Sequence, residues 1–177
     1  SKELKTLTEI YDFYEKDKHK FENLASKVAE NIIKKSAKNY KAGWITKGSG
    51  DSGIDFIGRM DIGTGFGSAK VIVLGQAKCE SLDKPTGGNH IARTVAKLKR
   101  GWLGVYVTTS YFSDPVQIEI LEDKYPLLLI NGKKLAELVN EIVFDQGYKN
   151  VAEYLKKIDS EYEGLIQYRD PEEILFE

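Results

Sequence analysis

The sequence predicts an α/β sandwich in which helices flank a central mixed β-sheet. Two strand-like segments, residues 54–61 and 70–78, lie on either side of a Gly-rich turn and predict a hairpin. Beyond them, helical and strand patterns alternate along the chain, which indicates strands joined by helical crossovers. With 177 residues and 41% hydrophobic content, the chain is long enough to form one domain with a sizeable core.

The N-terminal part is expected to be helical. Residues 3–16 and 20–37 each carry apolar side chains at helical spacing. The apolar positions are Leu4, Leu7, Ile10 and Tyr14 in the first helix, and Phe21, Leu24, Ala25, Val28 and Ile32 in the second. A short strand follows at residues 44–46, and the Gly- and Ser-rich segment 48–53 predicts a loop that leads into the hairpin.

The turn of the hairpin predicts its register. If the hairpin is symmetric about the peptide bond between residues 65 and 66, the numbers of paired residues add up to 131. Asp55 then lies opposite Gln76, with β-carbons about 5 Å apart. A β-bulge would shift this register.

The second half of the chain alternates helices and strands. Residues 80–88 contain Pro and Gly and predict a loop, after which Asn89 can cap a helix that runs to about Arg100. Buried strands are expected at 104–108 and 126–130, with a helix at 115–122 between them. Helices at 132–146 and 149–163 complete the pattern.

Composition restricts the class of protein. No apolar run approaches the length of about 20 residues that a membrane span needs, and no signal peptide is visible. The single Cys79 excludes an intrachain disulfide, fits a reducing cytoplasm and is expected to be a buried structural thiol. The net charge of −1 argues against strong unaided DNA binding. Basic clusters nevertheless flank the hairpin: Lys34, Lys35, Lys38, Lys41 and Lys47 before it, and Arg93, Lys97, Lys99 and Arg100 after it.

Asp55, Gln76 and Lys78 form a candidate active site for metal-assisted phosphodiester cleavage. Gln76 and Lys78 are two residues apart on one strand, so their side chains point to the same face. The Asp55 carboxylate, the Gln76 amide oxygen and the backbone carbonyl of Ala77 are hard oxygen ligands suited to Mg²⁺. Lys78 could orient or deprotonate the attacking water, or offset charge in the transition state. An ordinary hairpin with three exposed polar side chains is the alternative.

A further acid is expected from the second helix. Glu22 lies beside the apolar stripe, at the edge that faces the sheet, whereas Glu30 lies on the opposite side. Glu22 is therefore preferred to Glu30, although both could be ordinary solvent-facing glutamates. Asp51 could replace Asp55 as a ligand, but it lies in the loop before the strand.

Contacts with phosphate are expected around this site. Asn89, His90 and Arg93 share the opening of one helix, where backbone N–H groups attract anions. His90 lacks a partner at metal-ligand spacing, so a surface or capping role is favoured over a catalytic base. The hydroxyls of residues 108–110 could bind phosphate, but a turn at the strand end is the preferred interpretation.

At these residues the chain resembles the Mrr-like restriction endonucleases of the PD-(D/E)xK superfamily. The matching segments are 21–25, 48–55, 76–78, 107–113 and 129–135, in family order over roughly residues 20–140. The Gln-x-Lys variant resembles cleavage domains of the MspJI and AspBHI type, which cut DNA in response to 5-methylcytosine or its hydroxymethyl form. Gln-x-Lys alone is a weak motif, whereas the ordered set of segments is much more specific.

The resemblance implies a restriction-endonuclease-like fold and a Mg²⁺-dependent endonuclease acting on double-stranded DNA. It implies Asp55 and Gln76 at the metal, Lys78 at the water and Glu22 as supporting acid. Residues expected to contact DNA are Lys47, Ser49, Asn89, His90 and Arg93. The alternatives are a junction-resolving or repair nuclease, and a catalytically inactive DNA-binding module.

The resemblance also carries expectations about the whole enzyme. The chain is expected to be a single nuclease domain over residues 1–177, with a core at about 20–140 and a helical C-terminal extension at 141–177. It is expected to be a fragment of a larger enzyme, because related enzymes carry a separate domain that reads the modified base. A homo-oligomer is expected, because two cuts on a duplex need two active sites.

Overall fold

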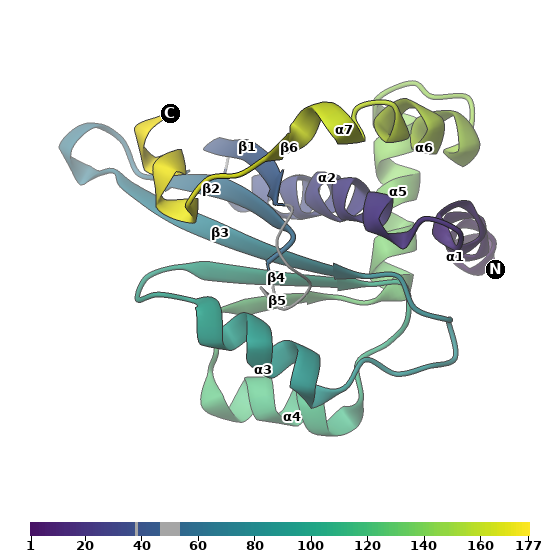
Figure 1. The fold of residues 1–177 in the computed structure, drawn as a ribbon, viewed down its shortest axis with the longest axis horizontal. Coiled ribbons are helices and arrows are strands. Elements are labelled where there is room, and N and C mark those ends of the chain that lie inside the picture. Colours follow the sequence, from purple (N-terminus) through teal and green to yellow (C-terminus); the bar gives the residue numbers. More distant parts are fainter. Residues whose placement is uncertain (38, 47–53) are drawn as a thin grey trace.

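The fold is built on a mixed sheet, as the sequence predicts. The computed structural model describes residues 1–37, 39–46 and 54–177, and these form a six-stranded sheet in the order β5-β4-β3-β2-β1-β6 (Figure 1). Antiparallel pairing joins β1 to β2 and β2 to β3, whereas β3, β4 and β5 run parallel, as do β1 and β6. The strands are β1 (Asn39–Thr46), β2 (Phe56–Ile62), β3 (Ala69–Lys78), β4 (Leu103–Thr108), β5 (Leu127–Ile130) and β6 (Ile166–Gln167).

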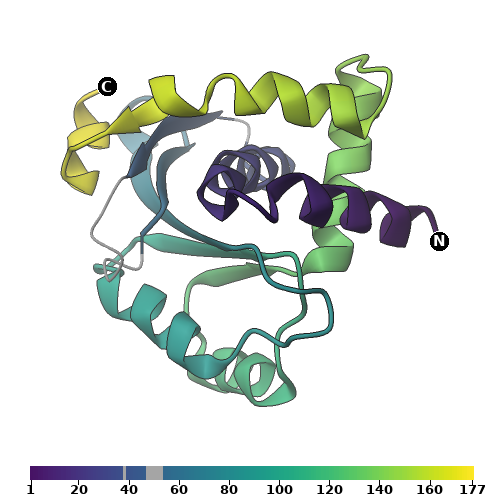
Figure 2. The same cartoon turned by 45° about the vertical axis from the view of Figure 1, so that its right-hand side comes forward.

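Helices cover both faces of the sheet (Figures 1 and 2). On one face lie α1 (Lys2–Tyr14), α2 (Phe21–Lys34), α5 (Gly132–Asp145) and α6 (Val151–Asp159); on the other lie α3 (Gly88–Lys97) and α4 (Asp114–Asp123). Strand β4 shows why both faces are apolar: Val105 and Val107 pack into the core under α2, and Tyr106 packs toward α3 and α4. Successive side chains of a strand alternate between faces, so β4 is buried on both sides.

The β2–β3 hairpin has the predicted register. Pairs run from Phe56 and Gly75 to Ile62 and Ala69, and each pair adds up to 131. In the turn, Gly63 has φ 78°, and a β-carbon there would lie 2.1 Å from the carbonyl oxygen of Gly67. Asp55 lies just beyond this ladder, and its backbone N–H donates to the Gly75 carbonyl (2.7 Å). The predicted pair of Asp55 with Gln76 is therefore not part of the ladder.

Several element boundaries differ from the prediction. Strand β1 begins at Asn39, five residues before the expected start at 44, and its ladder with β2 is irregular between Ala42 and Ile45. Helix α3 begins at Gly88 with Gly87 at the N-cap, so Asn89 is not the capping residue. The last expected helix is divided, because α6 ends at Asp159 and a short α7 (Tyr162–Leu165) follows.

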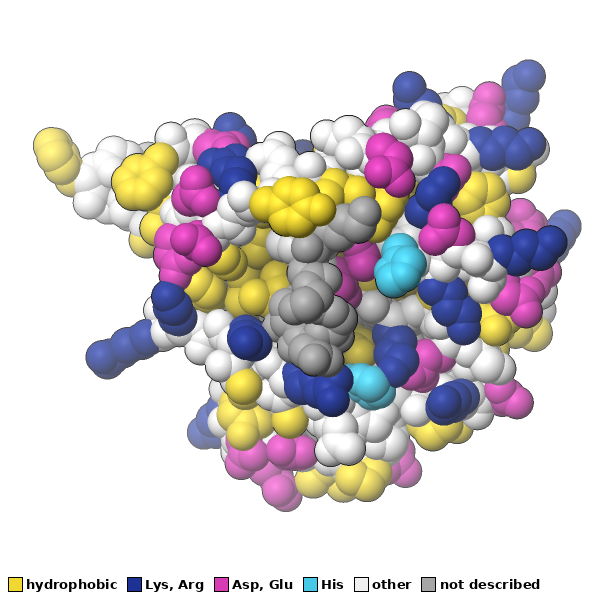
Figure 3. Space-filling model, in the orientation of Figure 1, with side chains coloured by type: hydrophobic (Ala, Val, Ile, Leu, Met, Phe, Trp, Pro, Cys, Tyr) yellow, Lys and Arg dark blue, Asp and Glu magenta, His cyan; other side chains and the backbone are white. Residues whose placement is uncertain are grey.

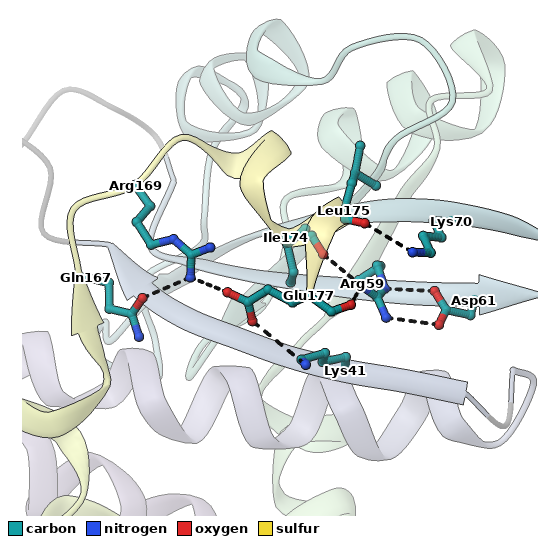
Figure 4. Close-up of polar contacts among 9 residues, drawn as sticks. All are labelled: Lys41, Arg59, Asp61, Lys70, Gln167, Arg169, Ile174, Leu175 and Glu177. Carbon is teal, nitrogen blue, oxygen red and sulfur yellow. Dashed lines mark hydrogen bonds and ion pairs between the residues drawn. The ribbon is translucent and has the colours of Figure 1, made fainter.

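The C-terminal segment is part of the sheet assembly rather than purely helical. Strand β6 pairs with β1, and the 3₁₀ helix η3 (Pro171–Phe176) lies against β2 and β3. Ile174 is fully buried in a cluster with Trp44, Ile57, Ile72 and Leu74. Figure 4 shows the polar contacts of this segment, in which Arg59 donates to the Ile174 carbonyl (2.8 Å) and to the Asp61 carboxylate (2.9 Å). Within the described residues, no helix is long and apolar enough to span a membrane.

Candidate active site

Asp55 is held at the point where the hairpin enters the sheet. Its carboxylate oxygen Oδ2 accepts a hydrogen bond from the Ala77 backbone N–H (2.8 Å). Burial raises the pKa of Asp55 to about 6, although the Ala77 N–H and the nearby His19 act in the opposite direction. The Ala77 bond fixes the orientation of the carboxylate relative to β3, so the acid that precedes β2 lies against the end of β3.

Glu22 brings a second carboxyl group to Asp55 from the first turn of α2. Burial raises the pKa of Glu22 to about 8, and repulsion from Asp55 is the next largest cause. The Tyr162 hydroxyl of α7 donates to Glu22 Oε2 (3.3 Å). Glu30 instead pairs with Lys34 on the same helix (3.7 Å) and lines a small hollow between α2 and β1. Of these two glutamates, Glu22 is therefore the one that interacts with Asp55.

Gln76 makes a contact that the sequence did not predict. Its side-chain oxygen Oε1 accepts a hydrogen bond from the Thr94 hydroxyl of α3. Thr94 is fully buried, and the sequence analysis did not select it. An amide oxygen has two lone pairs, so this contact orients Gln76 without excluding a second interaction at the same oxygen.

Lys78 lies between a histidine and an acid. Its Nζ is 2.6 Å from His90 Nε2 on α3 and 3.2 Å from Glu80 Oε1. Partial burial and the Lys78 ammonium lower the pKa of His90, which favours the neutral imidazole. An ammonium has donors only, so Lys78 donates and the neutral His90 ring accepts. His90 is thus more than a surface residue, because it contacts the candidate catalytic lysine.

Glu80 is a site residue that the sequence analysis missed. Its side chain is buried and accepts a hydrogen bond from the Thr86 hydroxyl (3.3 Å). The Thr109 hydroxyl accepts from the Glu80 N–H (2.7 Å) and donates to the Glu80 carbonyl (2.5 Å). The hydroxyls at the end of β4 therefore hold the segment after β3, in line with the strand-end turn preferred above. The position of Glu80, two residues after Lys78, was the available sequence signal.

The residues expected to contact DNA are only partly described. Asn89 and Arg93 are exposed on α3, the helix that carries His90. Figure 3 shows histidine side chains and several Lys and Arg side chains on one face of the molecule. Lys47 and Ser49, together with the alternative ligand Asp51 and the cluster residue Lys38, lie outside the described residues.

The donor set suits a hard divalent cation. Two partly buried carboxyl groups that repel each other, Asp55 and Glu22, are a site where a cation would offset the cost of ionising both. Carboxylate, amide and backbone carbonyl oxygens are the ligands that such ions prefer. In the described part of the chain, however, no group of three or more His, Cys, Asp or Glu side chains could hold a metal by itself.

Comparison with known proteins identifies the family. A family model described as restriction endonuclease (Mrr_cat) matches residues 14–139. A search of curated proteins finds no match. Among solved structures, the chain is similar to the MspJI restriction endonuclease in complex with a 27-mer oligonucleotide, with 44% identity, a TM-score of 0.93 and coverage of 99% of this chain.

A second solved structure, the DNA modification-dependent restriction endonuclease AspBHI, is 21% identical with a TM-score of 0.73 and shows the shared fold. The match covers 90% of this chain and 40% of that one, and the chain spans only 39% of the MspJI chain. The members of this family typically use a divalent metal. The family match over residues 14–139 and the similarity to MspJI over nearly the whole chain lead to one conclusion: the chain belongs to the Mrr_cat restriction endonuclease family.

Proposed function

We propose that this chain is the Mg²⁺-dependent cleavage domain of a restriction enzyme and hydrolyses phosphodiester bonds in double-stranded DNA. The observation that carries the proposal is the interaction of Glu22 with Asp55, whose carboxylate accepts from the Ala77 N–H between Gln76 and Lys78 on β3. The two acids come from different segments, and partly buried acids of raised pKa are typical of functional sites. The family match supports the same activity.

The metal would be held by Asp55, the Gln76 amide oxygen and the Ala77 carbonyl, with Glu22 as supporting acid. When bound, Mg²⁺ polarises the phosphate and lowers the pKa of a coordinated water. Asp55 is oriented for this role by the Ala77 N–H. The carboxylates do not contact phosphate directly in this arrangement, because like charges repel.

Lys78 supplies positive charge beside the reacting phosphate. Two of its three N–H donors point at His90 and Glu80 in the described part of the chain, so a third can reach a phosphate oxygen. Charge on the phosphate oxygens is redistributed in the transition state, where a fixed cation contributes most. Asn89 and Arg93 on the exposed side of α3, with Lys47 and Ser49, would contact the DNA backbone.

Recognition of a modified base is proposed to lie outside this chain. The chain spans 39% of the MspJI chain, which leaves room in such an enzyme for a separate reading domain. That domain would direct cleavage to 5-methylcytosine, and a homo-oligomer would supply two active sites for the two strands. Because Cys79 is the single cysteine, a reducing cytoplasm is compatible with the chain.

Plasmid cleavage tests the proposal. We expect the purified chain to nick and linearise plasmid with Mg²⁺ and to be inactive in EDTA. Asp55→Ala should abolish cleavage, because it removes the carboxylate proposed to hold the metal, while circular dichroism and the melting temperature stay close to wild type. Asp12→Ala, at an exposed position on α1, is the matched control and should cut normally.

Three outcomes would change the assignment. A wild-type chain that binds DNA but never cuts supports an inactive binding module. An Asp55→Ala chain that cuts at the wild-type rate makes Asp51 the next candidate ligand. Faster cleavage of a four-way junction than of linear duplex supports a junction-resolving nuclease.

A further inference from the structure

Helix α3 contacts the two strand residues of the candidate site through one face. His90 and Thr94 are four residues apart, so they lie one above the other on the helix, about 6 Å apart along its axis. Gln76 and Lys78 are two residues apart on β3, about 7 Å along the strand, and point to one face. The two spacings match, and the contacts are Thr94 with Gln76 and His90 with Lys78.

Both contacts are partly buried. Thr94 is fully buried and His90 is half-buried, so neither contact is an exposed surface pair. The Thr94 hydroxyl also lies 3.3 Å from the His90 carbonyl oxygen, which connects the two contacts within the helix. The second partner of Lys78, the buried Glu80, is fixed by Thr86 and by both backbone bonds to Thr109. The Lys78 ammonium is therefore held by two partners.

We propose that His90 and Thr94, together with Glu80, are positioning residues that set the Lys78 ammonium and the Gln76 amide for cleavage. This inference rests on the proposed nuclease function. Long flexible side chains such as Lys and Gln have many rotamers, and each must occupy one of them to act on a phosphate or a metal. A displacement of about 1 Å can cost on the order of 100-fold in rate. None of the three positioning residues needs to touch DNA for this role.

Two simpler roles, a structural role for Thr94 and a DNA contact for His90, predict different experimental results. If Thr94 only stabilises the fold, its loss should lower the melting temperature and leave the rate of the folded enzyme unchanged. If His90 only contacts a DNA phosphate, its loss should weaken DNA binding in proportion to the loss of cleavage. Separate measurement of the single-turnover rate at saturating DNA and of the DNA dissociation constant in EDTA distinguishes these roles.

Thr94→Val removes the hydroxyl and keeps the shape. We expect its single-turnover rate to fall by about 10- to 100-fold, whereas the dissociation constant changes by less than about twofold because the residue is buried. Thr94→Ser restores the hydroxyl and should recover most of the rate. Thr6→Val is the matched control. Thr6 on α1 is also buried, and its hydroxyl donates to the side-chain amide oxygen of Asn140 on α5 (2.8 Å). It should keep the wild-type rate.

His90 is tested by two substitutions and one spectrum. His90→Leu should lower the rate without lowering DNA affinity, and His90→Gln, whose amide oxygen can accept from Lys78, should be the more active of the two. The sequence contains only two histidines, so an imidazole ¹⁵N spectrum has His19 as internal reference. Lys78→Met should shift the His90 signals and leave those of His19 in place, whether or not the protein cuts DNA.

The outcomes separate this inference from the proposed function. A wild-type chain that never cleaves overturns both. A cleaving wild type overturns the positioning role alone in any of three cases: Thr94→Val cuts at the wild-type rate, His90→Leu loses rate and affinity equally, or Lys78→Met leaves the His90 signals unchanged. Loss of rate in Thr6→Val equal to that in Thr94→Val would likewise reduce Thr94 to a structural residue.

Discussion

At the scale of single residues, the candidate site combines two acids whose ionisation the protein disfavours with a lysine that already pairs with an acid. Burial raises the pKa values of Glu22 and Asp55, and repulsion from Asp55 raises that of Glu22 further, so each is costly to ionise in the protein alone. A divalent cation between such groups reverses this preference, because it favours their charged forms. Lys78 needs no such ion, since Glu80 already lies 3.2 Å from its ammonium.

Glu22 and Glu30 offer a matched test on one helix. Glu22→Gln should lower the single-turnover cleavage rate at least tenfold, because the acid that interacts with Asp55 loses its charge. Glu30→Gln should stay within about twofold of wild type, because Glu30 forms a surface pair with Lys34 that contributes little. Plasmid-cleavage kinetics at several Mg²⁺ concentrations make the comparison. Equal rates for the two variants would exclude Glu22 as the supporting acid.

The local sequence pattern predicted the register of the β2–β3 hairpin, but it did not predict which residues from other elements contact the hairpin. The symmetric Gly-rich turn was sufficient to predict the register, because a hairpin of seven residue pairs depends on contacts close in sequence. The ladder nevertheless stops before Asp55, whose backbone N–H donates to the Gly75 carbonyl. Thr94 could not be selected, since its contact with Gln76 exists only after a crossover places α3 over β3 and β4. The sequence contains no local signal for that packing.

At the scale of elements, long periodic helices were predicted well and the C-terminal segment was not. Helices α2 and α5 begin or end within three residues of the expected positions, because a buried apolar stripe repeats over several turns. Strand β6 has two residues, too few for any alternation to be recognised. Ile174 lies in an acid-rich stretch, so its full burial depends on the apolar surface that β2 and β3 present to it.

This docked segment should be required for stability. Ile174→Ala should lower the free energy of unfolding by about 2–5 kcal/mol, because it leaves a cavity among Trp44, Ile57 and Leu74. Phe176→Ala, in the same 3₁₀ helix but highly exposed, should change it by less than about 0.5 kcal/mol. Urea unfolding followed by circular dichroism measures both. If Ile174→Ala unfolds at the wild-type urea concentration, η3 is not a stabilising part of the domain.

At the scale of the whole molecule, the fold class followed from the order of elements. A hairpin followed by helices and buried apolar strands has few sterically allowed solutions, because crossovers between parallel strands must be right-handed and cover the sheet. The mixed sheet confirms this reasoning. The edge position of β6 and the division of helices between the two faces depend on long-range packing, which the linear pattern does not contain.

The isolated chain should cleave DNA without regard to base modification. Reading a modified cytosine requires a fitted pocket between aromatic or apolar side chains for a flipped base, and we propose that this pocket belongs to another domain. The net charge of −1 predicts weak general affinity that falls steeply with salt. Binding and cleavage of matched methylated and unmethylated duplexes, at about 50 and 200 mM salt, provide the measurement. A strong preference for the methylated duplex would place recognition within these 177 residues.

Cys79 can report motion at the candidate active site. Its thiol is 6% exposed, lies between Lys78 and Glu80 in the chain, and has no second cysteine to compete with it. A thiol reagent can therefore modify the native protein only when the end of β3 opens, so labelling should be far slower than in urea. DNA and Mg²⁺ that bind this strand end should slow labelling further. The labelling half-life would then report occupancy of the candidate site by DNA, even in variants that no longer cut. Rapid labelling of the native protein that DNA does not slow would show that this strand end is open in solution.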